Sequence, residues 1–145
     1  MHVIHTKDTQ NSSYADALAI RKEVFIKEQQ VPVEREIDEN EQQAIHFVLY
    51  NDQNKALATV RLLPSDNNTI KVQRMAVVKK ARKHHYGKVI MQEAENYASN
   101  HDYQKMTLGA QISAQNFYRN LGYQEEGDIF LDAGIEHITM TKNLF

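Results

Sequence analysis

Basic side chains gather in a turn near the middle of the chain. The apolar stretch Val72–Val78 leads into this turn, and an amphipathic segment beginning at Tyr86 follows it. A helix start offers unpaired N–H groups and the positive end of a dipole, so it attracts phosphate. The turn therefore indicates either a phosphorylated ligand or a solvated lysine-rich loop. Its basic residues are Lys79, Lys80, Arg82, Lys83 and Lys88.

Two charged residues interrupt the apolar stripe of the first expected helix. Arg21 and Glu28 lie two turns apart on that stripe. Buried charges are costly unless they are paired or face a polar cavity, and long side chains at the edge of a stripe can reach water. The carboxylates that follow form either a solvated loop or an acidic mouth that attracts a cationic amine. They are Glu34, Glu36, Asp38, Glu39 and Glu41.

Three further side chains are candidates for chemistry. His46 lies in an apolar strand, where it is either a core histidine or a group that transfers protons. Arg61 interrupts another apolar strand and either pairs with a carboxylate of the acidic segment or grips an anionic substrate group. Tyr118, next to Phe117, is either part of an aromatic core pair or an acid that protonates a leaving group.

Composition narrows the class of protein. The 145 residues suit a single domain, 1–145, and they include no cysteine, which excludes disulfides, thiolate catalysis and Cys-ligated zinc. The net charge of -2 gives no general attraction to nucleic acid or to acidic membranes. Adjacent His84 and His85 do not face one another on a helix, so we expect no metal site. The polar N-terminus lacks a signal-peptide core, and we expect a cytoplasmic protein.

Periodicity predicts a β-α-βββ-α-β-α-ββ order, an α/β (mixed α+β) class. We expect a twisted mixed sheet of about seven strands with helices on both faces. The first helix should end before Pro32, and the acidic segment after it should be irregular. The expected strands are 1–6, 44–50, 57–63, 69–78, 106–110, 123–131 and 135–142, with crossover helices at 86–100 and 113–121.

Two segments together resemble the GNAT superfamily of N-acetyltransferases: Met75-Ala-Val-Val through Gly87-Lys-Val-Ile-Met, and Ala114-Gln-Asn-Phe-Tyr-Arg-Asn-Leu-Gly-Tyr. Other segments are similar to the ElaA/YjcF-like branch, namely Arg21-Lys-Glu-Val-Phe-Ile-Lys-Glu-Gln, Val33-Glu-Arg-Glu-Ile-Asp, Ala44-Ile-His-Phe, Arg61-Leu-Leu-Pro and Asp132-Ala-Gly-Ile-Glu-His-Ile-Thr-Met. Part of the pattern also resembles acyl-homoserine-lactone synthases, although this chain is short for them and has no tryptophan.

The resemblance implies acetyl transfer from acetyl-CoA to an amine by direct attack, without a covalent enzyme intermediate. The Val77 N–H would polarise the thioester carbonyl, and Tyr118 would protonate the leaving thiolate. His85 stands where the family has a glycine, and its backbone should donate to the pyrophosphate if the turn avoids positive φ. The implied cofactor-binding residues are Met75, Ala76, Val77, Arg82, Lys83, His84, His85, Tyr86, Gly87, Lys88, Gln111 and Phe117.

The general base is the least determined role. Many relatives carry a glutamate on the central strand, but the nearest residue here is Gln73, which cannot accept a proton. The expected base is Glu28 or His46, in a pocket for a small-molecule or peptide amine shaped by Arg21, Glu34, Asp38, Arg61 and His137. Two other functions remain open: an acyl-CoA-binding regulatory module without turnover, and lactone synthesis from an acyl donor and S-adenosylmethionine. The resemblance leaves room for a homodimer.

Overall fold

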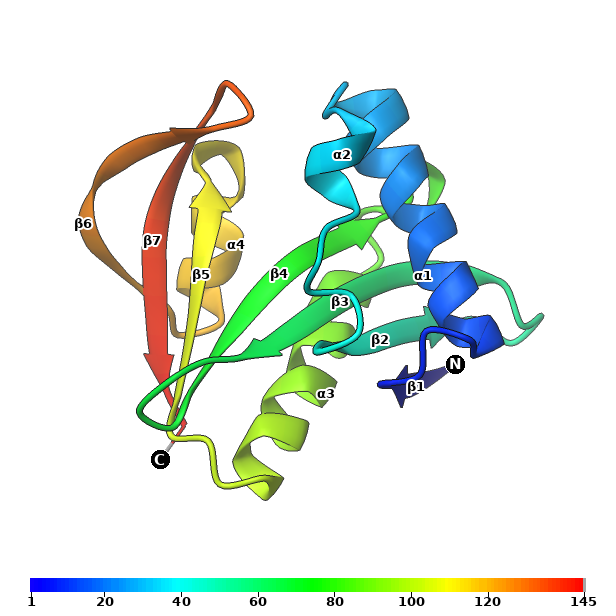
Figure 1. Ribbon diagram of the computed structural model, residues 1–145, viewed down its shortest axis with the longest axis horizontal. Helices are drawn as coiled ribbons and strands as arrows, with labels where there is room; N and C mark the ends of the chain where they lie inside the picture. The colour runs from blue at the N-terminus through cyan, green and yellow to red at the C-terminus, as the bar shows by residue number, and fades with distance from the viewer. Residues whose placement is uncertain (145) are drawn as a thin grey trace.

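Seven strands form one twisted sheet in the computed structural model, which describes residues 1–144 (Figure 1). The strand order is β1-β2-β3-β4-β5-β7-β6, and every neighbouring pair is antiparallel except β4 and β5. The mixed sheet and the positions of all expected strands are confirmed. The bounds are β1 (His2–Thr6), β2 (Ile45–Tyr50), β3 (Ala56–Pro64), β4 (Thr69–Val77), β5 (Lys105–Gln111), β6 (Gln124–Asp132) and β7 (Ile135–Asn143).

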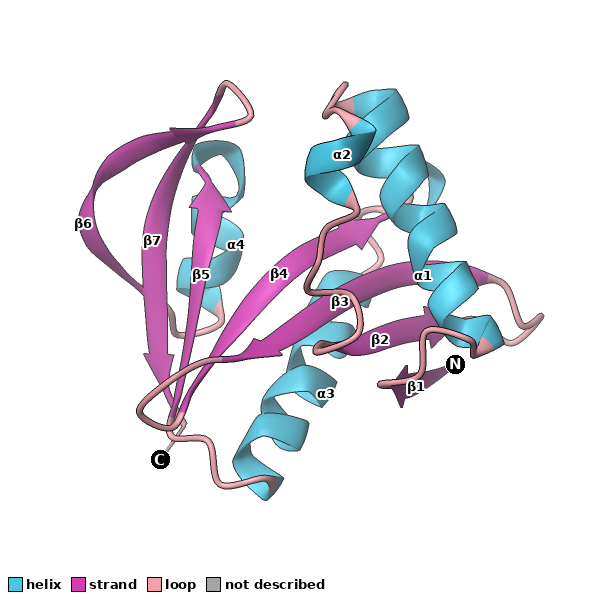
Figure 2. Cartoon of the chain, viewed as in Figure 1, coloured by secondary structure: helices cyan, strands magenta, loops and turns pink. Residues whose placement is uncertain are grey.

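Helices cover both faces of the sheet (Figure 2). One face carries α1 (Ser12–Arg21), which packs on β2, β3 and β4, and the short α2 (Val33–Glu36). The opposite face carries α3 (Tyr86–Asn100), which buries Ile90, Met91 and Ala94 against the same three strands, and α4 (Gln115–Asn120) beside β5. No helix within residues 1–144 is both long enough and apolar enough to cross a membrane.

The central parallel pair separates along its length. β4 and β5 pair only from Thr69 and Lys105 to Val72 and Leu108, and beyond that point they diverge (Figure 1). In β4 the register with β3 shifts, and Arg74 takes a positive φ of 56°. Such a bulge bends a strand and increases its twist. The end of β4 therefore presents backbone groups that have no partner strand on the β5 side.

The first helix changes its winding before it ends. After Arg21 the chain continues as a π-helical segment, Lys22–Glu28, in which the Gln29 N–H donates to the Val24 carbonyl at 3.0 Å. A π-helical hydrogen bond spans five residues, one more than an α-helical one, so Gln29 lies one turn after Val24 on the same side of the helix. The plain α-helix that we expected here would have put Glu28 there instead.

Candidate active site

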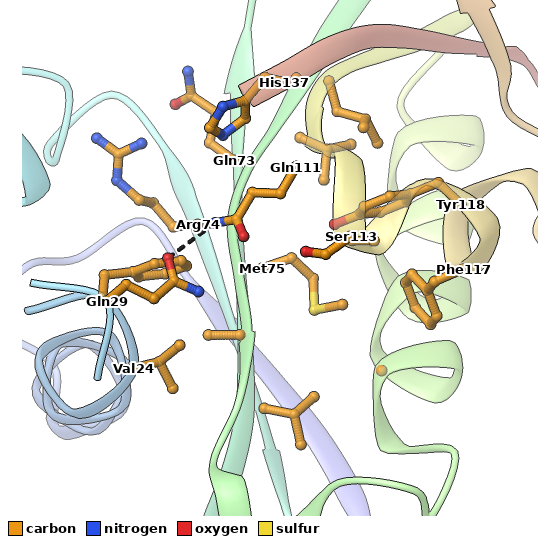
Figure 3. A pocket seen from close by; sticks show the side chains of 18 of the residues that line it. Val24, Gln29, Gln73, Arg74, Met75, Gln111, Ser113, Phe117, Tyr118 and His137 are labelled. Carbon is orange, nitrogen blue, oxygen red and sulfur yellow. Dashed lines mark hydrogen bonds between the residues drawn. The ribbon is translucent and has the colours of Figure 1, made fainter. Parts of the chain in front are cut away.

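A cavity of about 1240 Å³ fills the opening between β4 and β5 (Figure 3). Its walls come from the π-helical segment, from both diverging strands, from the start of α3 and from α4. Val24 and Gln29 lie on one side, Tyr118 and Phe117 lie on the other, and Met75 lies between them on β4. Segments far apart in the sequence thus meet at one cleft.

The start of α3 is built to receive an anion. Its N-cap residue, His85, makes no capping hydrogen bond through its side chain, so the first N–H groups of α3 lack a side-chain partner. Lys80, Lys83 and Lys88 are exposed nearby and form no ion pair with any of residues 1–144. A phosphate here would meet both the free N–H groups and the positive end of the helix dipole.

The same turn holds two residues in the left-handed region. Lys83 has a φ of 70° and His85 a φ of 64°. The condition attached to His85, that the turn avoids positive φ, is therefore not met: His85 takes a conformation that a glycine would adopt at no steric cost. Left-handed residues in a turn can point successive N–H groups toward one side, which suits an anion.

Arg82 and Glu28 are joined to each other. The two terminal nitrogens of Arg82 donate to the two carboxylate oxygens of Glu28 at 2.7 Å each, and Arg82 Nε donates to the Val77 carbonyl at 3.0 Å. The hydrogen bonds from Arg82 lower the pKa of Glu28. Glu28 does not line the cleft, and its carboxylate is engaged. This geometry argues against Glu28 as the base.

Tyr118 brings a phenol to the cleft. Burial raises the pKa of Tyr118, which keeps the hydroxyl protonated at neutral pH. The Tyr118 hydroxyl has no hydrogen-bond partner among residues 1–144. Every fully buried polar side-chain atom in that range has a partner, so this hydroxyl is not fully buried and must open onto the cleft. Figure 3 shows it pointing toward Ser113. The structure thus gives Tyr118 a protonated hydroxyl that faces the cleft.

Close packing surrounds the glycine at the start of α3. A Cβ on Gly87 would lie 3.2 Å from Phe117 Cζ and 3.3 Å from Met75 Cε. Those distances are shorter than ordinary van der Waals contact, so the side chains of Phe117 and Met75 would have to shift to admit a Cβ here. Gly87 therefore lets the start of the helix approach the strand whose edge lines the cleft.

Six charged residues form the arginine–carboxylate cluster behind the other wall. Arg21 Nε and Nη1 lie 3.1 Å and 2.8 Å from Glu36 and Glu41, and Arg61 Nη1 lies 2.9 Å and 2.8 Å from Asp38 and Glu41. Arg74 completes the cluster at 2.9 Å from Glu36 and 3.1 Å from Asp38. Three positive charges thus meet three negative ones, and the segment after Pro32 is fixed to the sheet.

The cluster explains several of the residues expected around the acceptor. Arg21 and Arg61 are each 1% exposed, and neither they nor Asp38 line the cleft. Of the two alternatives for Arg61, the structure shows pairing with the acidic segment. Most carboxylates of the expected acidic mouth are neutralised by arginines, while Glu34 is exposed and lies outside the cleft lining.

His46 is a core histidine. Its Nε2 lies 2.8 Å from the Glu41 carbonyl, and its ring packs edge-on against Tyr14 with centroids 4.7 Å apart. Burial lowers the pKa of His46. The side chain is 1% exposed and does not line the cleft, which argues against His46 as the base. The strand alternation that pointed to the core was the better guide.

The donor-side residues are brought together almost completely. His84 alone among the expected cofactor-binding residues does not line the cleft. No group of three or more His, Cys, Asp or Glu within residues 1–144 is arranged to hold a metal ion.

Sequence reasoning missed Gln29, Arg74 and Phe130, which also line the cleft. The acidic run and the arginines were the only sequence signals of charged residues near this wall. Nothing in the sequence marks Arg74 as the site of a bulge.

Comparison with known proteins agrees with this geometry. A family model described as an acetyltransferase (GNAT) domain matches residues 7–144. The chain belongs to the GNAT acetyltransferase family. An uncharacterized N-acetyltransferase of Bacillus subtilis, YjcF, is 40% identical over 129 residues, which cover 88% of this chain and 91% of YjcF. The ElaA/YjcF-like resemblance and the assignment as an acyltransferase are thereby confirmed.

Solved structures carry the same GNAT fold. The crystal structure of a putative N-acetyltransferase from Lactobacillus plantarum superposes with a TM-score of 0.93 at 25% identity, covering 99% of this chain and 98% of that one. Escherichia coli ElaA superposes with a TM-score of 0.87 at 23% identity, covering 98% and 99% of the two chains. The diverging pair β4 and β5 thus belongs to a GNAT domain.

Proposed function

We propose that this GNAT protein transfers the acetyl group of acetyl-CoA to a primary amine within a ternary complex. The observation that carries the proposal is the unpaired edge of β4, which runs to the uncapped start of α3 inside one cleft. An extended pantetheine arm can pair with a free strand edge, and a pyrophosphate suits a helix start. A single extended donor molecule accounts for both features.

On the donor side, Met75, Ala76 and Val77 hold the pantetheine arm through backbone atoms. The Val77 N–H polarises the thioester carbonyl, where negative charge develops during attack. The backbone from Lys83 to Lys88 receives the pyrophosphate, and the exposed lysines of the turn add charge to that contact. Arg82 acts mainly as a tether, because Glu28 already occupies its guanidinium.

Tyr118 protonates the departing CoA thiolate. Burial keeps the phenol protonated at neutral pH, so its proton is available when negative charge develops on the sulfur. The free hydroxyl opens onto the same cleft as Met75 and Phe117. The absence of cysteine is consistent with direct attack rather than an acyl-enzyme intermediate.

The acceptor wall favours an amine with a neutral body. Arg74 is paired with Glu36 and Asp38, and Arg35 reaches Asp132 at 2.9 Å, so the charges lining this wall are compensated. What remains is apolar or amide surface, including Val24, Phe25 and the pair Gln29–Gln111, joined by a 2.9 Å hydrogen bond. Polycationic acceptors gain little attraction from a wall of this kind.

CoA release tests the proposal directly. The chain has no cysteine, so a thiol reagent reads only the CoA that is set free. The probes are acetyl-CoA with tyramine, N-α-acetyl-lysine or spermidine, and we expect release to be fastest with tyramine. Acetyl-CoA alone should also raise the thermal midpoint, because it binds only the folded chain.

A second candidate function is an acyl-CoA-binding module without turnover, which Gln73 on the central strand favours. A thermal shift with acetyl-CoA but no CoA release with any of the three amines would support that alternative. No shift with acetyl-CoA or CoA would overturn the donor site itself, and with it both functions.

A further inference from the structure

The ring of His137 is held in one tautomer. Its Nδ1 lies 2.7 Å from the Ile135 carbonyl oxygen, which can only accept a hydrogen bond. Nδ1 must therefore carry the proton, and in the neutral ring Nε2 keeps its lone pair. The hydrogen bond within β7 thus prepares the other nitrogen as a proton acceptor.

The free nitrogen opens onto the cleft. His137 lines the cleft, and its Nε2 has no hydrogen-bond partner among residues 1–144. Every fully buried polar side-chain atom in that range has a partner, so Nε2 is not fully buried. Nε2 therefore reaches the cavity rather than the protein interior. Figure 3 shows His137 at the end of the cleft that Gln73 also lines.

Packing fixes the plane of the imidazole. The ring stacks on Phe130 with centroids 5.7 Å apart and an interplanar angle of 24°. Gly109 on β5 makes room for this stack, because a Cβ there would lie 3.1 Å from Phe130 Cζ and 4.0 Å from His137 Cδ2. A group held on two sides keeps its lone pair directed at one point, which proton transfer requires.

The other proton acceptors of the acceptor wall are paired or exposed. Glu36 is bound through one oxygen by Arg21 and through the other by Arg74. Asp132 is exposed to solvent and is held by Arg35 through Oδ1, and His85 lies at the phosphate end of the cleft, at the start of α3. Among the described residues of the acceptor wall, His137 is the buried titratable side chain whose acceptor atom is not already engaged.

We propose that His137 is the general base of acetyl transfer. This inference rests on the proposed function and names a residue expected only to shape the acceptor pocket. Nε2 takes one proton from the acceptor ammonium, and the freed lone pair forms a C–N bond to the thioester carbonyl carbon. The C–S bond breaks, the sulfur takes a proton from Tyr118, and the amide nitrogen loses its extra proton to water. Water restores Tyr118 and receives the proton from His137, so one proton is released per turnover.

The test uses His137→Asn, because the Asn amide can still donate to the Ile135 carbonyl. With the fastest amine of the panel, kcat should fall about 10²-fold, while the acetyl-CoA concentration for half-maximal rate stays unchanged. With 4-methoxyaniline, whose amine is unprotonated at neutral pH, the loss should be at least about tenfold smaller. Added imidazole should restore part of the rate with the first amine.

His101→Asn is the matched control. His101 Nδ1 also contacts a backbone carbonyl, that of Tyr97 at 2.8 Å, but the side chain is exposed just after the end of α3 and does not line the cleft. This variant should keep the wild-type rate. An unchanged rate in His137→Asn, or an equal loss with both kinds of amine, would overturn the assignment as base. A wild-type protein that binds acetyl-CoA but releases no CoA with any amine, 4-methoxyaniline included, would remove the proposed function and this inference together.

A long-range 1H–15N spectrum tests the tautomer without any acceptor. The His137 signals, assigned by their loss in His137→Asn, should show a protonated Nδ1 and an unprotonated Nε2 at slightly alkaline pH. A proton on Nε2 would overturn the proposal even if the variant were inactive.

Discussion

The two sides of the cleft treat charge in opposite ways. On the acceptor side, the arginine–carboxylate cluster is largely buried and each of its six members is paired within it. On the donor side, the basic turn from Lys79 to Lys88 is largely exposed and includes strained backbone, and most of its cations form no ion pair with any of residues 1–144. Both sides are rich in charged residues, so composition alone does not separate them.

This difference separates residues that hold the walls of the cleft in place from residues whose charge is available to a ligand. A buried charge is tolerated only when its partners are in place, so the cluster fixes the segment after Pro32 and the bulge at Arg74. An exposed cation without a partner costs little and stays available for a ligand. The cluster therefore fixes the shape of one wall of the cleft, and the turn keeps its cations available to the proposed donor.

Breaking the cluster should have the largest effect. Arg21→Met leaves an excess negative charge among buried carboxylates, and we expect a loss of about 3–5 kcal/mol in the free energy of unfolding. Urea denaturation measures it. Arg35→Met is the matched control: Arg35 and Asp132 are 55% and 54% exposed, and their pair should contribute less than about 1 kcal/mol. Equal losses in both variants would show that burial does not distinguish the pairs.

Removing the proposed acid tests the donor side at the chemical step. Tyr118→Phe should lower kcat by about 10²-fold with little change in the thermal midpoint, since only the hydroxyl that opens onto the cleft is lost. The acetyl-CoA shift of the midpoint should be preserved. A normal rate across the pH range would mean that solvent protonates the thiolate, and Tyr118 would then be a packing residue.

Acid should weaken the cluster by protonating Asp38. Burial acts to raise the pKa of Asp38, but the hydrogen bonds and charge of Arg61 outweigh it and lower the pKa from 3.8 to about 2. A lowered folded pKa gives stability that is present above about pH 4 and is lost as the pH falls toward 2, here about 2 kcal/mol.

Urea denaturation at several acidic pH values, with Asp38→Asn alongside, checks this contribution. The difference in stability between wild type and Asp38→Asn should shrink between about pH 5 and pH 2.5. A constant difference over that range would show that Asp38 is not charged and paired in the folded protein.

The strained turn should give the smallest effect, in the opposite direction. His85→Gly relieves a left-handed residue, and we expect a gain of about 1 kcal/mol in the free energy of unfolding. His84→Gly, at a neighbour whose φ is not positive, should instead lose about 0.5–1 kcal/mol. A loss in both variants would show that the His85 side chain contributes more than its backbone costs.

The fold was largely predictable because its signals are local. The apolar runs of β2 and β3, the helical stripe of α3 and the turns between them each arise from residues close in sequence. Glu28 shows where this reasoning fails. An α-helical period places it on the stripe with Arg21, but the π-helical segment brings Gln29 to the cleft and leaves Glu28 to Arg82.

The sequence by itself determined the order of the elements, the anion-attracting turn before α3 and, through its motifs, the GNAT family. Only the tertiary structure decided which charges are free. Arg21 pairs with Glu36 and Glu41, 15 and 20 residues away, and Arg82 pairs with Glu28, 54 residues away. Nearby charges and hydrogen bonds decide whether a charged side chain is available to a ligand. Those partners come from segments distant in the sequence, so local sequence patterns do not predict them.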